Sequence, residues 1–469
     1  MKSKLQWLPA PLRSIGLYAL GVGVVNGVNF VTAPLLLALL GTSEFARWGL
    51  LEPILILGIT LAGFGLQNSL LRTIRGDVDA DRRAVEILLP FYLSSAVVVG
   101  ISSAFIVWWV GEKGTVALLI GIIVLAEATM AFVATLWRCQ DRAGLYVIFE
   151  GGRAFIVVMV LLLALYLVSF SFGDIADYLW LRALTVVVAM LVAYIIVRPG
   201  WRLDPAEGLS ALAYGGPIVL ASLCAASLTS IDRYALAIWG DSTTIAAYVA
   251  HVKLSQVLGS IVVPFYVWFA PKAVYWLEFD RRDPDFIITA TSIYVTVLAG
   301  ICASIWLATP TIWPIIFPTI ELDQLLFAIL LVGAAIYALG NPVSIGVLRP
   351  GKTYQALVIT LLSTTAGAAA SFALAPVLSS IGVSLGRGLG LLLYTALFAI
   401  NTAVSLKINY RWGLCATVIL VLLGFCIGIE RLVPGHDFIS LGLKLASLGI
   451  VFSFLLLGVQ LRCRPRMAK

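Results

Sequence analysis

Three cationic side chains interrupt long apolar runs of this sequence: Arg153, Arg233 and Lys253. A charge near the centre of a bilayer costs about 2.5–3.5 kcal/mol on insertion scales, so such residues usually face a cavity and serve a function. A guanidinium binds phosphate through two parallel hydrogen bonds, and an ammonium acts as a point charge. The three residues therefore predict a site for a phosphate-bearing substrate within the membrane.

Two of these cations also have a structural interpretation, which the sequence leaves open. Arg153 could form a salt bridge with Glu127 of a neighbouring apolar run, and both residues would then be structural. Arg233 lies near the end of its run, where its long side chain can extend the charge to the interface.

Four other ionisable residues inside apolar runs are candidates for coupling to an ion: Glu52, Glu127, Asp232 and His251. A carboxyl group in a cavity can take up and release a proton as access alternates between the two sides of the membrane. An imidazole titrates near neutrality even without perturbation. We expect H⁺ or Na⁺ as the coupled ion.

The first apolar run adds two amides, Asn26 and Asn29, within a glycine-rich stretch. Residues three apart lie on one face of a helix. Their amide groups can bond the hydroxyls of a sugar, and they can equally hold two helices together at close approach. Both interpretations stay open at this point.

The composition requires that these residues be held by membrane-spanning helices. Of the 469 residues, 61% are hydrophobic and only 12% are charged, against about 25% charged in an ordinary soluble domain. A helix needs about 20 residues to cross the hydrocarbon. The sequence predicts an all-α multi-pass protein with about fourteen spans, near residues 14–40, 46–71, 84–110, 115–137, 145–169, 176–197, 209–238, 243–270, 286–308, 322–346, 353–377, 383–406, 412–432 and 438–460.

The loop charges predict the orientation of these spans. Lys and Arg gather in the N-terminal segment, in every second loop and in the C-terminal tail, whereas the alternate loops carry only Arg47, Lys113, Arg387 and Arg431. Positive charge concentrates on the cytoplasmic side. An even number of helices follows, with both termini in the cytoplasm.

A weak internal repeat predicts the domain organisation. Gly41-Thr42-Ser43 aligns with Gly240-Asp241-Ser242, and the same offset places Glu52 on His251. The offset spans six helices, so the two halves share one orientation, as in parallel repeats of transporters. We expect an N-lobe over residues 1–204, a C-lobe over 205–406, and two additional helices with a basic tail over 407–469.

Several function classes are excluded or lack their signature. The six cysteines are widely scattered and predict no disulfide framework, metal site or bound cofactor. The basic excess belongs to membrane topology, so no nucleic-acid partner is expected. There is no P-loop motif. No loop is long enough to form an outer domain of the kind that membrane-bound polymerases and ligases use, so we do not expect an enzyme.

Four segments resemble signatures of bacterial polysaccharide and O-antigen flippases, the Wzx-like polysaccharide transporters. The segment LLGTSEFARWG at residues 39–49 is similar to their "LLGPEEFGLYG", and GFGLQNSLLR at residues 63–72 is similar to "GLxxAxxR". The pattern YGGP with a later IDR, at residues 214–233, resembles "YGLP…DR", and AYVAHVKL at residues 247–254 resembles "GxYxxAxKL". Gly216 and Ala247 depart from the usual leucine and glycine.

The resemblance implies the fold of the MOP superfamily, which includes MATE-type multidrug exporters and lipid II flippases. It implies transfer of a polyprenyl-diphosphate-linked oligosaccharide from the cytoplasmic to the outer leaflet of the bacterial inner membrane. Alternating access would carry the polar headgroup while the prenyl tail stays in lipid. The last two helices are candidates for contact with other polysaccharide assembly proteins.

Three alternatives remain at this stage. A MATE-type drug or metabolite exporter would favour acidic and aromatic cavity walls. A membrane-embedded polymerase or ligase acting on the same lipid would show a large external loop. A scaffold with an inactive cavity would pair its intramembrane charges, Arg153 with Glu127 and Lys253 with Asp232.

Overall fold

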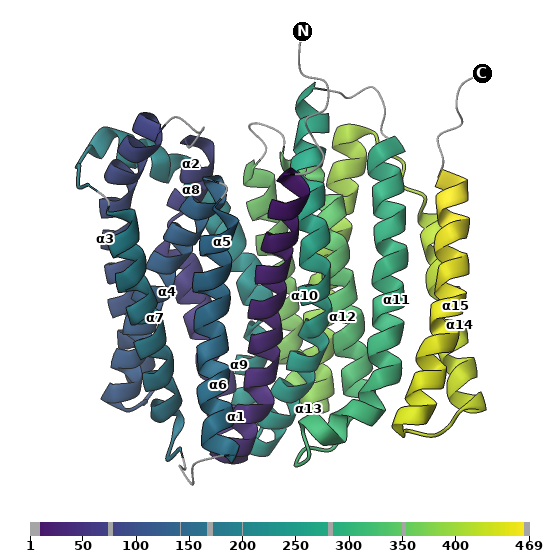
Figure 1. Cartoon of the computed structure of the whole chain (residues 1–469). Coiled ribbons are helices and arrows are strands. Elements are labelled where there is room, and N and C mark those ends of the chain that lie inside the picture. Colours follow the sequence, from purple (N-terminus) through teal and green to yellow (C-terminus); the bar gives the residue numbers. More distant parts are fainter. Residues whose placement is uncertain are drawn as a thin grey trace. The chain divides into compact units, whose positions relative to one another are not determined.

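The computed structural model describes residues 10–73, 78–140, 142–166, 172–198, 200–279, 285–348 and 353–463 (Figure 1). These residues form helices joined by short turns, and they contain no strand. Eleven of the described helices are long and apolar enough to cross a membrane. The expectation of an all-α multi-pass membrane protein is confirmed.

The chain divides into two compact units, residues 1–249 and 250–469. The first unit holds α1 (Ala10–Ala62), α2 (Leu66–Thr73), α3 (Val78–Trp109), α4 (Gly114–Cys139), α5 (Ala143–Tyr146), the π-helix η1 (Val147–Gly151), α6 (Gly152–Tyr166), α7 (Ile175–Val197), α8 (Pro205–Leu228), α9 (Ile231–Trp239) and the start of α10 (Ser242–Phe279). The second unit holds the rest of α10, α11 (Asp285–Ile316), α12 (Gln324–Val343), the 3₁₀ helix η2 (Ser344–Leu348), α13 (Thr353–Leu406), α14 (Trp412–Leu432) and α15 (Phe438–Cys463).

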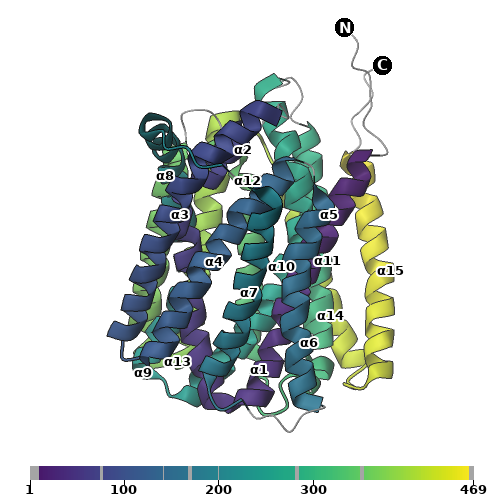
Figure 2. The same ribbon diagram turned by 60° about the vertical axis from the view of Figure 1, so that its left-hand side comes forward.

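Helix α4 forms the centre of the first unit. It is buried along most of its length and packs against α3 and α7, which run beside it in both views (Figures 1 and 2). A Cβ atom on Gly100 of α3 would lie 2.9 Å from the carbonyl oxygen of Gly121 on α4. Small residues at such crossings let two backbones approach closely. This close packing places polar side chains of α4 within reach of its neighbours.

A glycine break separates α1 from α2 near the predicted end of the second span. Gly65 has a φ of +77°, which glycine adopts without steric cost. A Cβ atom on Gly65 would lie 2.2 Å from the backbone of Gly215 on α8. The motif segment at residues 63–72 thus positions α2 against α8 through direct backbone contact.

The turn before α7 is fixed by ionic and capping bonds. Asp174 accepts a hydrogen bond from the backbone N–H of Ala176, and its carboxylate lies 2.9 Å from the ammonium of Lys113. The bond from Lys113 lowers the pKa of Asp174 below its ordinary value. An ionised aspartate at a helix N-terminus also interacts favourably with the helix dipole. This pair ties the α3–α4 loop to the start of α7.

In the second unit, α13 contains a reversal of the chain at Ser379, whose φ is 49°. Residues 371 and 386 would lie about 22 Å apart along a straight helix. Instead, a Cβ atom on Gly386 would lie 2.3 Å from the backbone nitrogen of Ser371. The single helical element therefore contains a hairpin, at the gap predicted between residues 377 and 383.

The break predicted after residue 40 is confirmed, because α1 consists of two helices joined at Gly41, whose φ of 77° and ψ of 177° are non-helical. The predicted spans differ from the structure in two places. The predicted span 209–238 breaks between Leu228 and Ile231 into α8 and α9. The predicted span 243–270 lies within α10, which extends to Phe279. The count of fourteen, the cytoplasmic termini and the domain boundaries at residues 204 and 406 stay predictions.

Candidate functional site: an intramembrane arginine–carboxylate cluster

The first unit brings together four charged side chains from four elements: Glu127 of α4, Glu150 of η1, Arg153 of α6 and Arg182 of α7. One oxygen of Glu127 lies 2.7 Å from Nη1 of Arg153, and the other lies 3.2 Å from Nη2 of Arg182. Arg153 also donates to Glu150 at 2.6 Å. A single carboxylate is therefore shared by two guanidinium groups that arrive from different helices.

The local fold explains how Glu150 and Arg153 reach the same point. They are three residues apart, which places them on one face of a helix. The segment from Val147 to Gly151 is a π-helix, an uncommon turn that is frequent at functional sites. Glu150 lies within this turn and is buried. The π-turn thus supplies the cluster with its second carboxylate.

The cluster is electrically balanced, with two carboxylates and two guanidinium groups. Taking each charge out of water costs several kcal/mol, and only close pairing offsets that cost. The Glu127 side chain is 8% exposed, but those of Arg153 and Arg182 are 20% and 24% exposed. Nε of Arg153 has no hydrogen-bond partner among the described residues. The two arginine side chains are therefore more exposed than the carboxylate that they share.

An aromatic pair holds the guanidinium of Arg182 from the other side. The guanidinium carbon lies 5.7 Å from the ring centroid of Trp48, and Trp48 packs edge-on against Tyr178 with centroids 5.0 Å apart. Trp48 belongs to the motif segment at residues 39–49. A cation over an indole face gains about 0.5–2 kcal/mol. This contact orients Arg182 without neutralising it.

A second ion pair of the first unit joins two predicted site residues, Arg233 of α9 and Glu52 of α1, at 2.9 Å. Arg233 also donates to the carbonyl oxygen of Gly49, and its side chain is only 2% exposed. Neighbouring Asp232 is fully buried and accepts a hydrogen bond of 2.5 Å from the hydroxyl of Tyr248. In this arrangement Arg233 ties α9 to α1.

The structure places the remaining predicted site residues in α10 and α1. His251 is buried in α10, where its Nε2 accepts a hydrogen bond from the backbone N–H of Asp323 at 3.0 Å and its ring packs on Trp313. Lys253, two residues along, is half-buried. In α1, Asn26 is half-buried and Asn29 is exposed. Within the described residues there is no cluster of side chains that could hold a metal ion.

Sequence reasoning missed two members of the cluster, Glu150 and Arg182. Both lie inside predicted spans, and the rule that selected Arg153 applies equally to them. The spacing of Glu150 and Arg153 was a further signal. The pair between Arg153 and Glu127 matches the structural alternative considered for those residues.

The comparisons with known proteins agree on a family and on a fold. Residues 12–269 match a family described as "Polysaccharide biosynthesis protein". The chain belongs to this family. Its matched region includes all four motif segments and the whole arginine–carboxylate cluster. A comparison with curated protein sequences finds no match.

Solved structures similar to the chain are membrane transporters of the MOP type. The lipid II flippase MurJ, in an inward closed conformation, matches with a TM-score of 0.68 at 11% identity, over 93% of this chain and 98% of MurJ. A MATE transporter in complex with MaL6 matches with a TM-score of 0.61 at 13% identity, over 85% of this chain and 96% of that one. An inward-facing multidrug resistance MATE transporter matches with a TM-score of 0.56 at 14% identity, over 84% and 94%.

These matches confirm the fold expected from the resemblance. At such identities the similarity concerns the fold and carries no residue roles. The protein is therefore a multi-pass membrane member of the polysaccharide biosynthesis family with a transporter fold.

Proposed function

We propose that the protein is a flippase that moves a polyprenyl-diphosphate-linked oligosaccharide from the cytoplasmic to the outer leaflet of the bacterial inner membrane. Membership of the polysaccharide biosynthesis family and the fold shared with a lipid II flippase support this proposal. The transfer would proceed by alternating access of two lobes. It makes and breaks no covalent bond, so no catalytic residue or cofactor is assigned.

The observation that carries the proposal is the sharing of Glu127 by Arg153 and Arg182. Because one small anionic group bridges both guanidinium groups at 2.7 and 3.2 Å, the two cations are spaced to bind one phosphoryl group together. In this proposal a diphosphate takes the place of the Glu127 carboxylate between the two guanidinium groups. Arg153 and Arg182 are then the substrate cations of the first unit.

Glu127 acts in this scheme as the counter-ion of the unloaded site. When no diphosphate is bound, its carboxylate and that of Glu150 together balance the two arginines, whose charges would otherwise be costly in a low-dielectric environment. When a diphosphate binds, it displaces the carboxylate. The protein can therefore change conformation both loaded and unloaded without leaving the two cations unpaired.

The remaining predicted residues have other roles in the proposal. Asn26 and Asn29, on one face of α1, would bond sugar hydroxyls, and Lys253 would add a point charge for phosphate. Arg233 is the weakest of the substrate candidates, because its guanidinium is committed to Glu52 and Gly49. Other polysaccharide assembly proteins are proposed as partners.

Coupling to H⁺ or Na⁺ is assigned to Glu52, Asp232 and His251 rather than to Glu127. Protonation of Glu127 would free the arginines for substrate, so proton and substrate would favour each other's binding. Export driven by an inward ion gradient needs the opposite linkage. Replacing each of the three residues singly, and measuring transport against imposed H⁺ and Na⁺ gradients, separates the two ions.

Deletion of the gene tests the function in cells. Mass spectrometry of extracted lipids should then show accumulation of one complete polyprenyl-diphosphate glycan, protected from reagents that reach only the outer leaflet. Unchanged lipids together with a new sensitivity to cationic drugs would instead indicate a MATE-type exporter. The balanced charge of the cluster argues against that alternative, because a site for organic cations needs an excess of carboxylates.

A further inference from the structure

The segment between α7 and α8 is hydrogen-bonded to α3 through a carbonyl group that a proline leaves without its helical donor. Pro90 lies inside α3 and has no N–H, so the carbonyl of Glu86, four residues earlier, loses its helical partner. The backbone N–H of Arg202 donates to that carbonyl oxygen at 3.0 Å. We call residues 200–204 the strap. Its position is set by this hydrogen bond.

Close contacts keep the strap in place. A Cβ atom on Gly200 would lie 2.5 Å from Oε1 of Glu86. The backbone of the strap therefore packs directly against the side chain of Glu86, with no room for a larger residue at position 200. At the other end, Asp204 caps α8 by accepting from the backbone N–H of Glu207. The indole N–H of Trp201 donates to the hydroxyl of Tyr194 at 2.9 Å. The strap and its tryptophan are therefore held in a defined position over α3.

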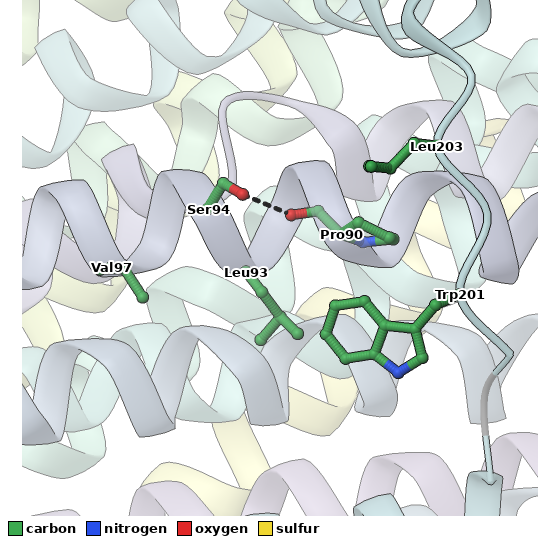
Figure 3. A pocket seen from close by; sticks show the side chains of 6 residues that line it. All are labelled: Pro90, Leu93, Ser94, Val97, Trp201 and Leu203. Carbon is green, nitrogen blue, oxygen red and sulfur yellow. Dashed lines mark hydrogen bonds between the residues drawn. The ribbon is translucent and has the colours of Figure 1, made fainter.

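A hollow of about 690 Å³ lies between the strap and α3 (Figure 3). Its lining consists of Pro90, Leu93, Ser94, Val97, Trp201 and Leu203. The one hydroxyl among them, on Ser94, donates to the carbonyl oxygen of Pro90 within the same helix. The lining therefore offers no unsatisfied donor to water. The hollow is therefore a mainly apolar, open depression.

The hollow continues into a face of α3 that is suited to contact lipid. Val98, Ile101 and Phe105 follow Val97 along the helix and are 61%, 66% and 55% exposed. Pro90 and Val97 lie about 10 and 20 Å along the helix axis from the exposed charge of Arg83. The hollow therefore extends from the interface toward the hydrocarbon. An empty hollow would forfeit the dispersion contacts of its lining.

We propose that this hollow is a binding site for an acyl chain of a phospholipid in the leaflet at the N-terminal end of α3. The loop charges predict that this is the cytoplasmic leaflet. The bulk lipid that covers the exposed face of α3 supplies such chains directly. Arg198 and Arg202, which flank Trp201 in the sequence and are both exposed, would supply guanidinium groups to the phosphate of the headgroup.

Photo-crosslinking of the full-length protein tests the proposal. The protein is reconstituted into vesicles of phosphatidylethanolamine and phosphatidylglycerol that contain phosphatidylethanolamine with a diazirine on one acyl chain. After irradiation, mass spectrometry of peptides locates the label. We expect enrichment at Leu93, Val97 and Trp201 over Ile101 and Phe105, because a retained chain reacts more often than passing bulk lipid.

Two substitutions of the same kind provide the matched control. Val97→Trp fills the hollow and should abolish the enrichment, whereas Val98→Trp, on the adjoining exposed face, should preserve it. Trp201→Ala removes the cover of the hollow and should also abolish the enrichment. The Trp201→Ala variant therefore still tests the proposal if the Val97→Trp variant does not fold. Thermal unfolding and gel filtration confirm that each variant is intact.

Three results would overturn the assignment. Uniform labelling along α3 would show that an acyl chain stays in the hollow no longer than it stays on the exposed face of the helix. Equal labelling of wild type and Val97→Trp would place the chain elsewhere. Loss of label on addition of a polyprenyl phosphate, but not of unlabelled phosphatidylethanolamine, would identify a prenyl chain as the occupant in place of an acyl chain.

Discussion

Replacing Glu127 with glutamine separates substrate binding from turnover. The substitution keeps the size of the side chain and removes the charge that neutralises Arg153 and Arg182. Arg153 retains Glu150 at 2.6 Å, and Arg182 retains the ring of Trp48 and its hydrogen bond with the side chain of Tyr178. The arginines then lack the carboxylate that competes with a diphosphate. We expect tighter binding of substrate and slower flipping.

The size of the effect follows from the geometry. Two unit charges about 4 Å apart interact by about 4 kcal/mol at an effective dielectric constant of about 20. Both arginines are partly exposed, and the neutral amide still accepts hydrogen bonds, so only part of this energy is released. A net gain of about 1.4 kcal/mol corresponds to about tenfold tighter binding. Turnover falls because the unloaded protein then has one carboxylate, that of Glu150, for two cations.

The assay is equilibrium binding of the purified lipid-linked glycan to protein in nanodiscs, paired with flipping rates in vesicles. Glu52→Gln is the matched control, since it removes the partner of the buried Arg233 and should lower thermal stability without tightening substrate binding. Unchanged or weaker binding by Glu127→Gln, with the protein folded, would refute the view of Glu127 as a counter-ion displaced by substrate.

Three further predictions concern folding. Gly65→Ala forces a side chain into a positive-φ position against backbone atoms and should prevent recovery of folded protein on gel filtration, whereas Gly424→Ala in open space should behave as wild type. Asp174→Asn should lower the free energy of unfolding near neutral pH by under about 1 kcal/mol, because the pair with Lys113 is largely exposed. The thermal midpoint should fall accordingly. Since the folded-state pKa of Asp174 is lowered, this difference should persist above pH about 4 and vanish as the pH falls through that folded pKa; a constant difference would contradict the assignment. Lys444→Met should keep or raise the thermal midpoint, because Lys444 is buried, donates to the carbonyl oxygen of Gly435, and is replaced by a side chain without a desolvation cost; a large loss would show that the ammonium contributes to stability.

Hydropathy sufficed to predict much of the fold. Spans depend on local composition, so α3, α4, α7, α14 and α15 lie close to their predicted ranges. The break between α8 and α9 was missed, because Thr229 and Ser230 are too few to interrupt an apolar window. The reversal at Ser379 lies in the predicted gap, although the helical assignment runs through it.

The candidate site was only partly predictable, because pairing depends on contacts between distant segments. Composition selected Glu127, Arg153, Glu52 and Arg233 as intramembrane charges, but it could not indicate that Arg233 would meet Glu52 across 181 positions of the chain. It likewise could not indicate that Arg182 would join Glu127. Packing of α4 against α7 creates that contact, and neither residue carries a local signal for it.

Reconstituted transport tests the central claim most directly. The purified protein is placed in vesicles with a labelled polyprenyl-diphosphate glycan, and a reagent confined to the outside reports how much headgroup has crossed. We predict protein-dependent flipping that is lost in the double variant Arg153→Gln/Arg182→Gln and retained in Arg431→Gln, which changes a cation in the last turn of α14 that is not a member of the cluster. Flipping no faster than in protein-free vesicles, or equal rates for wild type and the double variant, would contradict the proposed role of the cluster.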